Sequence, residues 1–419
     1  MTELERLLHR ERRRLVALLA RRLGLSHMAL AEDAVQTACL RALQNWPQQG
    51  WPAAPEAWLF RVAERAAIDL LRAQQREQPL PDGDDSTEPS HPAHAAASAA
   101  PEQRFAGELD DDELALLFAA CHPILPPASQ VLLALRALAG WELAQLAPLF
   151  FSSEAALAQR LARARAQLAT VPLEVPAGTE LPPRREAVLT ALSLMFHEGQ
   201  RAAGRLGTGV PSGRATDAVR PCWEAIRLAR ALAAHPAAGA PAADALAAML
   251  LLHGARLTGR FDADGDLLPL PGQPRDRWDG GLIRLGLLHL QRSQRGQQLS
   301  RWHLLAGIAA EHAMAPSYAA TDWAAIVGYY ETLLRLDPSA APRLGHAIAL
   351  AEAGSAERAQ ALLTEWLPQV PQALRAHALA ALARASQRLG DTDTARKWLD
   401  AAIAVAPHEA DARMLARWL

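Results

Sequence analysis

The stretch from residue 81 to residue 113 sets the outline of this 419-residue chain, because it cannot form a folded core. It carries ten acidic residues against a single arginine, and proline, serine and alanine fill most of its first half. Segments with high net charge and few large apolar side chains bury too little surface to offset the entropy lost on folding. We therefore predict an acidic flexible linker over 81–113, with separately folded units on either side.

The segments outside this linker have apolar residues at helical spacing. Aromatic residues make up only 5% of the chain, while alanine and leucine dominate, which favours helices packed through short side chains over a β-sandwich or barrel. We predict an all-α protein with no strands. The expected parts are one helical unit at 1–80, a second small unit at 114–170, a proline-rich linker at 171–184, and a long helical extension at 185–419.

Signatures of catalysis and metal binding are missing from the sequence. His197-Glu198 is not followed by the second histidine of a zinc-protease helix. The acidic run from Asp262 to Asp266 has Gln273 where a calcium loop needs a bidentate glutamate, so it is expected to be a solvated turn. We assign no metal, no cofactor and no enzymatic activity. The sequence also lacks an apolar run long enough for a membrane span, and we expect a cytosolic protein.

The second unit contains a pattern typical of a helix-turn-helix. Residues 140–147 read as a first helix, and Pro148 to Phe151 as its end and the turn. A second helix is expected to start around Ser152, Ser153 and Glu154, with serine as N-cap and the glutamate at the positive end of the helix dipole.

This second helix separates apolar from polar positions. Its spacing turns three leucines inward, Leu157, Leu161 and Leu168. The same spacing leaves four polar side chains available to solvent or phosphate, Gln159, Arg160, Arg163 and Arg165. A recognition helix is built in this way, with base-reading groups and backbone-binding arginines on one face. An amphipathic helix with a solvated arginine face is the alternative, and the segment alone does not decide between them.

The end of the chain shows a weak internal period. Gly354 and Gly390 are 36 residues apart, and so are Ala359 and Ala395. Each glycine stands between two helix-like runs, where it can end a helix with a positive φ. Such spacing indicates two or three helical hairpins of the tetratricopeptide type, whose period is about 34 residues. A generic helical bundle with coincidental spacing remains the alternative.

Several stretches together resemble a known family. They occur in the expected order at 31–43, 55–72, 111–136, 154–168, 185–199 and 321–339. On these stretches the chain resembles the extracytoplasmic-function sigma factors of the sigma-70 family, in the branch with a C-terminal tetratricopeptide-type extension. The resemblance implies that 1–80 is region 2, which binds RNA polymerase and captures the unpaired minus-ten strand, and that 114–170 is the helix-turn-helix of region 4.

The resemblance also implies roles for single residues. Polymerase docking falls to Asp33, Gln36, Leu40 and Trp46. Capture of the promoter strand falls to Trp58, Arg61, Arg65, Arg72 and Arg76. Contacts with the upstream duplex fall to Ser152, Ser153, Glu154, Gln159, Arg160 and Arg163. Leu40, Trp46 and Trp58 are also natural core residues, and for Trp58 the core is slightly favoured.

Two departures from the family pattern bear on these roles. Glu64 places a carboxylate in the strand-capturing helix, where the family commonly has asparagine or a basic residue. In the extension, Gly345-His346 replaces the usual Asn-Arg pair, so whatever the extension recognises is expected to differ.

Charge favours action through a larger partner. The first unit has a net charge of only +3 and the second of only +2, and affinity for duplex DNA scales with the number of phosphates neutralised. The expected partners are RNA polymerase core, promoter DNA and a protein or peptide bound by the extension. Two other interpretations stay open: a helical-repeat scaffold that binds only proteins, and a small-molecule-sensing regulator that binds duplex DNA unaided.

Overall fold

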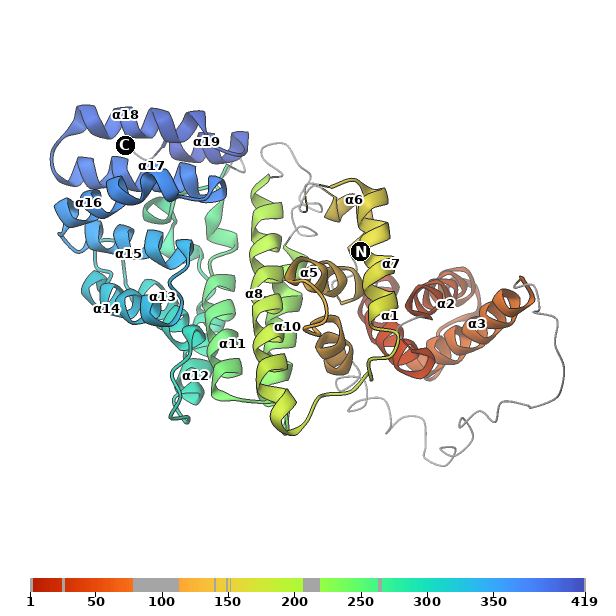
Figure 1. The fold of residues 1–419 in the computed structure, drawn as a ribbon. Helices are drawn as coiled ribbons and strands as arrows, with labels where there is room; N and C mark the ends of the chain where they lie inside the picture. Colours follow the sequence, from red (N-terminus) through yellow and green to blue (C-terminus); the bar gives the residue numbers. More distant parts are fainter. Residues whose placement is uncertain are drawn as a thin grey trace. The chain divides into compact units, whose positions relative to one another are not determined.

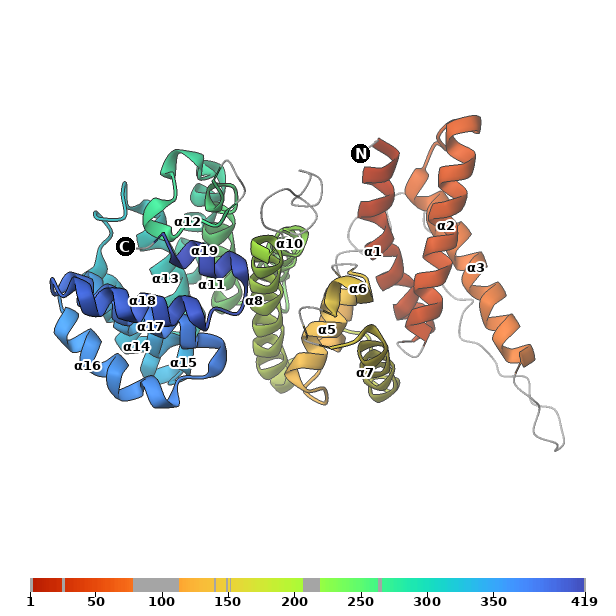
Figure 2. The ribbon, with the colours of Figure 1, turned by 90° about the horizontal axis from the view of Figure 1, so that it is seen from above.

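The structure is a computed structural model, and it describes residues 3–24, 27–77, 113–138, 141–147, 150, 152–205, 219–262 and 266–417. The predicted acidic linker lies outside these residues except for its last position. The described chain is helical throughout, without a strand, which confirms the predicted fold class (Figures 1 and 2). One isolated antiparallel bridge joins Phe261 to Leu267. Among the described residues, no helix combines the length and apolarity that crossing a bilayer requires.

The chain forms two compact units, Met1–Ala191 and Leu192–Leu419. The helices that the structure gives for the first unit are α1 (Glu3–Leu23), α2 (Met28–Gln49), α3 (Pro55–Glu77), α5 (Pro127–Ala137), α6 (Leu143–Leu146) and α7 (Glu154–Gln167), with a further helical stretch at 113–120. The boundary between the units falls inside α8 (Leu181–Arg205). The second unit continues with α10 (Arg220–Ala234), α11 (Pro241–Gly254), α12 (Gly280–Ser293), α13 (Arg301–Met314), α14 (Trp323–Leu336), α15 (Ala340–Glu352), α16 (Ala356–Trp366), α17 (Gln372–Arg388), α18 (Thr392–Ala404) and α19 (Glu409–Leu415).

Helices α1, α2 and α3 pack together as a bundle in the first unit. Their buried side chains include Leu15, Val35 and Leu59. The sequence suggests a break at Trp46-Pro47, but α2 runs through Pro47 to Gln49. A proline in the last turn removes only one helical hydrogen bond, and the helix ends at Gly50, whose φ is +85°.

The second part of the first unit packs around the stretch 113–120, in which every residue is buried. The guanidinium of Arg184 donates a hydrogen bond of 2.9 Å to the carbonyl of Phe118, within this stretch. Arg184 belongs to α8, which begins at Leu181, inside the predicted proline-rich linker. Pro182 and Pro183 therefore occupy the first turn of a helix, where their missing N–H groups cost nothing.

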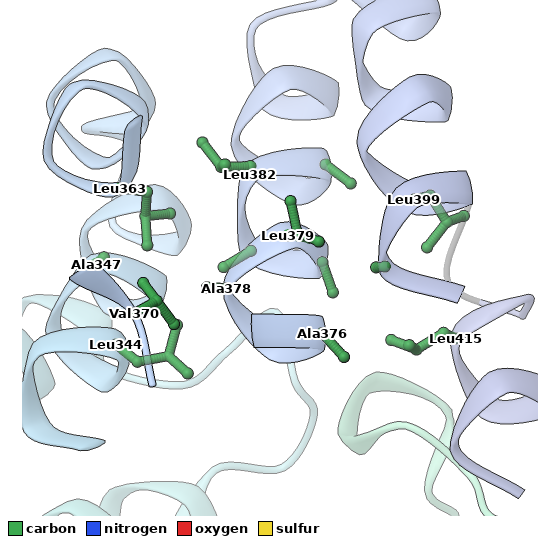
Figure 3. Packing of buried hydrophobic residues seen from close by; sticks show 14 residues of the cluster. Leu344, Ala347, Leu363, Val370, Ala376, Ala378, Leu379, Leu382, Leu399 and Leu415 are labelled. Atoms are coloured by element: carbon green, nitrogen blue, oxygen red, sulfur yellow. The ribbon is translucent and has the colours of Figure 1, made fainter. Parts of the chain in front are cut away.

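Antiparallel helices follow one another in chain order from α14 to α18 in the second unit (Figure 1). Leucines and alanines from α15 to α19 form one of its cores, with Leu379 and Leu382 of α17 between Leu363 of α16 and Leu399 of α18 (Figure 3). The corners between helices have the predicted geometry, because Gly354 and Gly390 have φ values of +88° and +80°.

Candidate nucleic-acid interface

Helix α3 presents an exposed basic face. Arg61, Arg65 and Arg72 are exposed, and their spacing of four and seven residues places them along one side of the helix. Ile68 lies on the same side and is 41% exposed. Because arginines can bind successive phosphates of a single strand while an apolar group contacts a base, this face suits unpaired nucleic acid. The side chain of Arg76 lies outside the described part of the chain.

The glutamate that interrupts this basic helix is paired. The carboxylate of Glu64 accepts a hydrogen bond of 2.5 Å from Arg22 of α1, and both side chains are partly exposed. The guanidinium of Arg22 also lies over the ring of Phe60, 4.9 Å from its centre. The carboxylate of Glu64 in α3 is thus balanced by a cation within the bundle.

Three tryptophans join the end of α2 to the start of α3. Trp46 is 3% exposed, and its ring centre lies 5.6 Å from that of Trp51 and 5.3 Å from that of Trp58. Trp46 therefore belongs to the core, as the alternative in the sequence allowed, and offers little surface for docking. Trp58 is only half-buried, and it stands at the end of the arginine face.

The predicted docking face of α2 is exposed at its other three positions. Asp33, Gln36 and Leu40 all point to solvent, and Leu40 is 51% exposed. Leu43 extends the apolar part of this face. The structure also shows a groove of about 300 Å³ here, lined by Arg12, Gln36, Cys39, Leu40, Leu43, Arg136 and Glu142. A large exposed leucine beside a carboxylate and an amide is a surface suited to a protein partner.

A buried ion cluster ties α2 to the second part of the unit. The carboxylate of Glu32 accepts from Arg136 of α5 at 3.3 Å and from Arg165 of α7 at 3.2 Å. All three side chains are at least four-fifths buried. Arg136 also donates to the carboxylate of Glu142 and to the carbonyl of Trp141, both at 3.0 Å.

Sequence reasoning missed this cluster. It expected Arg165 to be available to solvent or phosphate, and the structure instead pairs Arg165 with Glu32. The two residues lie 133 positions apart, so no local pattern could have joined them. The only local signal is that Glu32 follows the buried Ala31, at the edge of the helix's apolar side.

Helix α7 has the architecture that the sequence predicts. Ser153 is its N-cap, and the serine Oγ accepts a hydrogen bond of 3.2 Å from the backbone N–H of Ala156. The three predicted inward leucines are buried: Leu157, Leu161 and Leu168. The predicted contact residues Ser153, Glu154, Gln159 and Arg163 are exposed, while Ser152 and Arg160 are half-buried.

The helix before α7 is shorter than predicted. α6 covers only Leu143–Leu146, with Glu142 as N-cap and a capping box completed by Gln145. Pro148, Leu149 and Phe151 of the predicted turn lie outside the described residues. The described part therefore gives a one-turn helix followed by a well-capped second helix.

The acidic run in the second unit has a structural role. Asp266 accepts from Arg413 at 3.1 Å and from Arg417 at 2.9 Å, and Asp262 accepts from Arg417 at 2.5 Å. The side chain of Asp266 is 12% exposed, so the expected solvated turn is wrong at this position. In the parts of the chain that the structure describes, no group of three or more histidine, cysteine and acidic residues could hold a metal ion.

Comparison with known proteins finds family matches for two segments of the chain. The sigma-70 region 2 family matches residues 7–77, and a family of unknown function, DUF6596, matches residues 184–294. An uncharacterized protein of Rhizobium meliloti (strain 1021) is 36% identical over 400 residues, which cover 92% of this chain and 88% of the relative. No solved structure matches the chain. The chain therefore belongs to the sigma-70 family, as a member whose N-terminal region 2 is followed by a C-terminal extension that contains the DUF6596 segment.

Proposed function

We propose that this protein is a sigma factor that directs RNA polymerase core to a subset of promoters. The observation that carries the proposal is the pair of exposed faces within the region 2 match, one on α2 and one on α3. The two faces differ in chemistry, which suits two different partners. In this role the protein is a transcription factor and not an enzyme.

The face on α2 would bind polymerase. Asp33 offers a carboxylate, Gln36 an amide, and Leu40 an exposed apolar side chain. A partner surface with basic and apolar groups would match all three, and the burial of Leu40 would supply most of the affinity. Trp46 would contribute indirectly, because its contact with Trp58 holds the end of α2 against α3.

The face on α3 would hold the unpaired promoter strand. Arg61, Arg65 and Arg72 would bind phosphates, Arg76 would extend the row, and Trp58 would offer its exposed edge to a base. Helix α7 would read the upstream duplex with the residues predicted for it, Ser152, Ser153, Glu154, Gln159, Arg160 and Arg163. The N-terminus of α7 favours phosphate, because its orphan amides and dipole attract negative charge.

Polymerase would be needed for both DNA contacts. The two parts carry small positive charges, and Arg165 is already occupied by Glu32. Holding both parts on one large enzyme makes each weak contact intramolecular, which raises the effective concentration of the other. The extension would serve as a regulatory or partner-binding module, built from helical hairpins of the tetratricopeptide type.

The test is run-off transcription with purified core polymerase and promoter templates selected from transcripts that rise on overexpression. Leu40→Asp should abolish retention of core polymerase in a pull-down, because it places a charge where apolar burial is needed. Leu288→Asp is the matched control, since Leu288 of α12 is 42% exposed and lies outside region 2. It should retain core polymerase fully.

A triple variant separates strand capture from docking. Arg61→Ala, Arg65→Ala and Arg72→Ala together should leave core retention intact and prevent opening of the promoter, which permanganate footprinting detects. Failure of the wild-type protein to bind core polymerase would contradict the proposal and favour a protein-binding scaffold. Tight salt-sensitive binding to duplex DNA without polymerase would favour a regulator that acts alone.

A further inference from the structure

The second unit contains a cavity of about 520 Å³, within the range of sites for small molecules. Its walls come from α13, α14, α15 and α17, and the short 3-10 turn η4 (Leu270–Gly272) borders one side. Ahead of this turn, Asp266 pairs with Arg413 of α19 and with Arg417, and Asp262 pairs with Arg417. The cavity is therefore a defined space between ordered elements.

Flat aromatic rings line the cavity. Trp323 is part of this lining and contacts two other rings, since the ring centres of His312 and Tyr318 are 5.2 Å and 5.1 Å away, each edge-on. Tyr330 adds a further ring, which packs directly on Gly345 of α15. A Cβ atom at position 345 would stand only 2.4 Å from the Tyr330 ring. The glycine thus gives the tyrosine the room that leaves the cavity open.

The titratable rings in this wall are uncharged at neutral pH. Burial, and then the nearby Arg256 and Arg275, lower the pKa of His312 to about 4, so the imidazole is neutral. Burial raises the pKa of Tyr330 to about 12. Burial, and then the nearby carboxylate of Glu352, also raise the pKa of Tyr318. The rings therefore offer apolar faces and neutral hydrogen-bonding groups.

The charges around the cavity favour a negative ligand. Glu352 is the only acidic residue in its lining, and its side chain is 1% exposed because Arg384 and Arg388 of α17 hold both carboxylate oxygens. Arg417 is balanced by Asp262 and Asp266, but the Glu352 cluster has two guanidiniums against one carboxylate and keeps one positive charge in excess. A cationic ligand would find its one possible acceptor already occupied, whereas an anion would meet a net positive edge.

We propose that this cavity binds a small planar molecule with mainly apolar surface and one negatively charged group. The flat part lies against Trp323 and Tyr330, and the charged group lies toward Arg384, in the cluster that has one positive charge in excess. This site is independent of promoter recognition, so it can be tested whether or not the protein proves to be a sigma factor. Binding would link four helices and η4, and would therefore raise the unfolding temperature of the second unit.

The probe is anilinonaphthalene sulfonate, a planar aromatic anion whose fluorescence rises in apolar surroundings, titrated against the full chain. Phenylnaphthylamine, which has the same rings without the sulfonate, is the neutral comparison. We expect one saturable site for the anion and weaker binding of the neutral dye. Equal or tighter binding of the neutral dye would overturn the proposal, and so would the absence of saturation.

Two glycine variants locate the site. Gly345→Ala pushes the Tyr330 ring into the cavity and should weaken binding of the anion by about tenfold, the effect of a misplaced methylene in a ligand pocket. Gly328→Ala on α14 is the matched control, because an added Cβ there meets nothing within 4 Å. It should bind as the wild type does.

A third variant covers the case in which Gly345→Ala does not fold. Leu270→Trp narrows the cavity from the side of η4 without touching α15, and it should weaken binding to a similar degree. Circular dichroism confirms that each variant is folded before titration. Unchanged affinity in a folded Gly345→Ala or Leu270→Trp protein would show that the dye binds elsewhere and would overturn the assignment.

Discussion

The two units each contain a buried glutamate held by two arginines, and the difference between these clusters lies in how far apart the partners are in the chain. Glu352 is held by Arg384 and Arg388, which lie 32 and 36 residues further along, one helical hairpin away. Glu32 is held by Arg136 and Arg165, which are 104 and 133 residues away.

Because of this difference in separation, we expect the two glutamate–arginine clusters to have different structural roles. The Glu352 cluster joins neighbouring elements of one stack, so it persists as long as the stack is folded. The Glu32 cluster joins the α1–α3 bundle to a part of the same unit that is separate in the sequence, and we expect that it opens without either part unfolding. Opening would free Arg165 of α7 and expose the side of α2 next to the proposed docking face.

The largest expected effect comes from removing Glu352. Glu352→Ala removes a carboxylate that is 1% exposed and that accepts hydrogen bonds from two arginines, which should lower the free energy of unfolding of the second unit by about 4 kcal/mol. Urea unfolding followed by circular dichroism measures this. Glu357→Ala, at an exposed position of the neighbouring helix α16, should change stability by less than about 0.5 kcal/mol. Equal losses of stability in the two variants would show that the buried Glu352 cluster does not stabilise the second unit more than an exposed glutamate does.

Acid should weaken the second unit by a somewhat smaller amount. Burial, with help from Arg256, keeps the pKa of His253 well below its ordinary value, and burial likewise lowers that of His312 to about 4. Above about pH 6.5 both states carry neutral histidine; as the pH falls toward 4, only the unfolded state gains the proton. His312 alone should therefore cost about 3 kcal/mol over this range.

Unfolding at a series of pH values checks this expectation. Replacing His312 with glutamine, which does not titrate, should remove about 3 kcal/mol of the pH dependence of the second unit between pH 6.5 and 4 and leave the share of His253. If the variant keeps the full slope, another group is responsible. Acid thus weakens the second unit through its histidines, while the arginines of both glutamate clusters stay charged.

The smallest effect is expected at the Glu32 cluster. A double-mutant cycle of Glu32→Ala and Arg136→Ala should give a coupling energy of about 1 kcal/mol at low salt, because the Glu32 carboxylate is 15% exposed whereas that of Glu352 is 1% exposed. Raising the salt should reduce it through screening. The corresponding cycle of Glu352 with Arg384 should give a larger value that changes little with salt. Equal salt dependence of the two coupling energies would contradict the expectation that the Glu32 cluster opens more easily than the Glu352 cluster.

Local rules predicted much of the fold. Helical periodicity gave the all-helical class, the positive φ at Gly354 and Gly390 followed from their place between helix-like runs, and the N-cap at Ser153 followed from its place before an apolar-periodic segment. Each of these features depends on residues within a few positions of one another, so a single sequence contains the whole signal.

The features that the sequence did not reveal depend on distant partners. Arg165 was expected to face solvent, and Asp262 and Asp266 were expected to form a solvated turn, because their partners lie more than 130 residues away. The core position of Trp46 was left open, since a tryptophan in an amphipathic helix fits both core and interface. The roles of the predicted contact residues stay predictions.

The positive φ values at Gly354 and Gly390 limit which residues can replace glycine at these two corners. An added side chain at either corner would meet nothing within 4 Å, so crowding does not restrict the choice of residue. The backbone alone imposes the restriction, at about 1 kcal/mol for most residues and less for asparagine, which tolerates left-handed geometry. Asparagine should therefore be the least costly replacement for glycine at either corner.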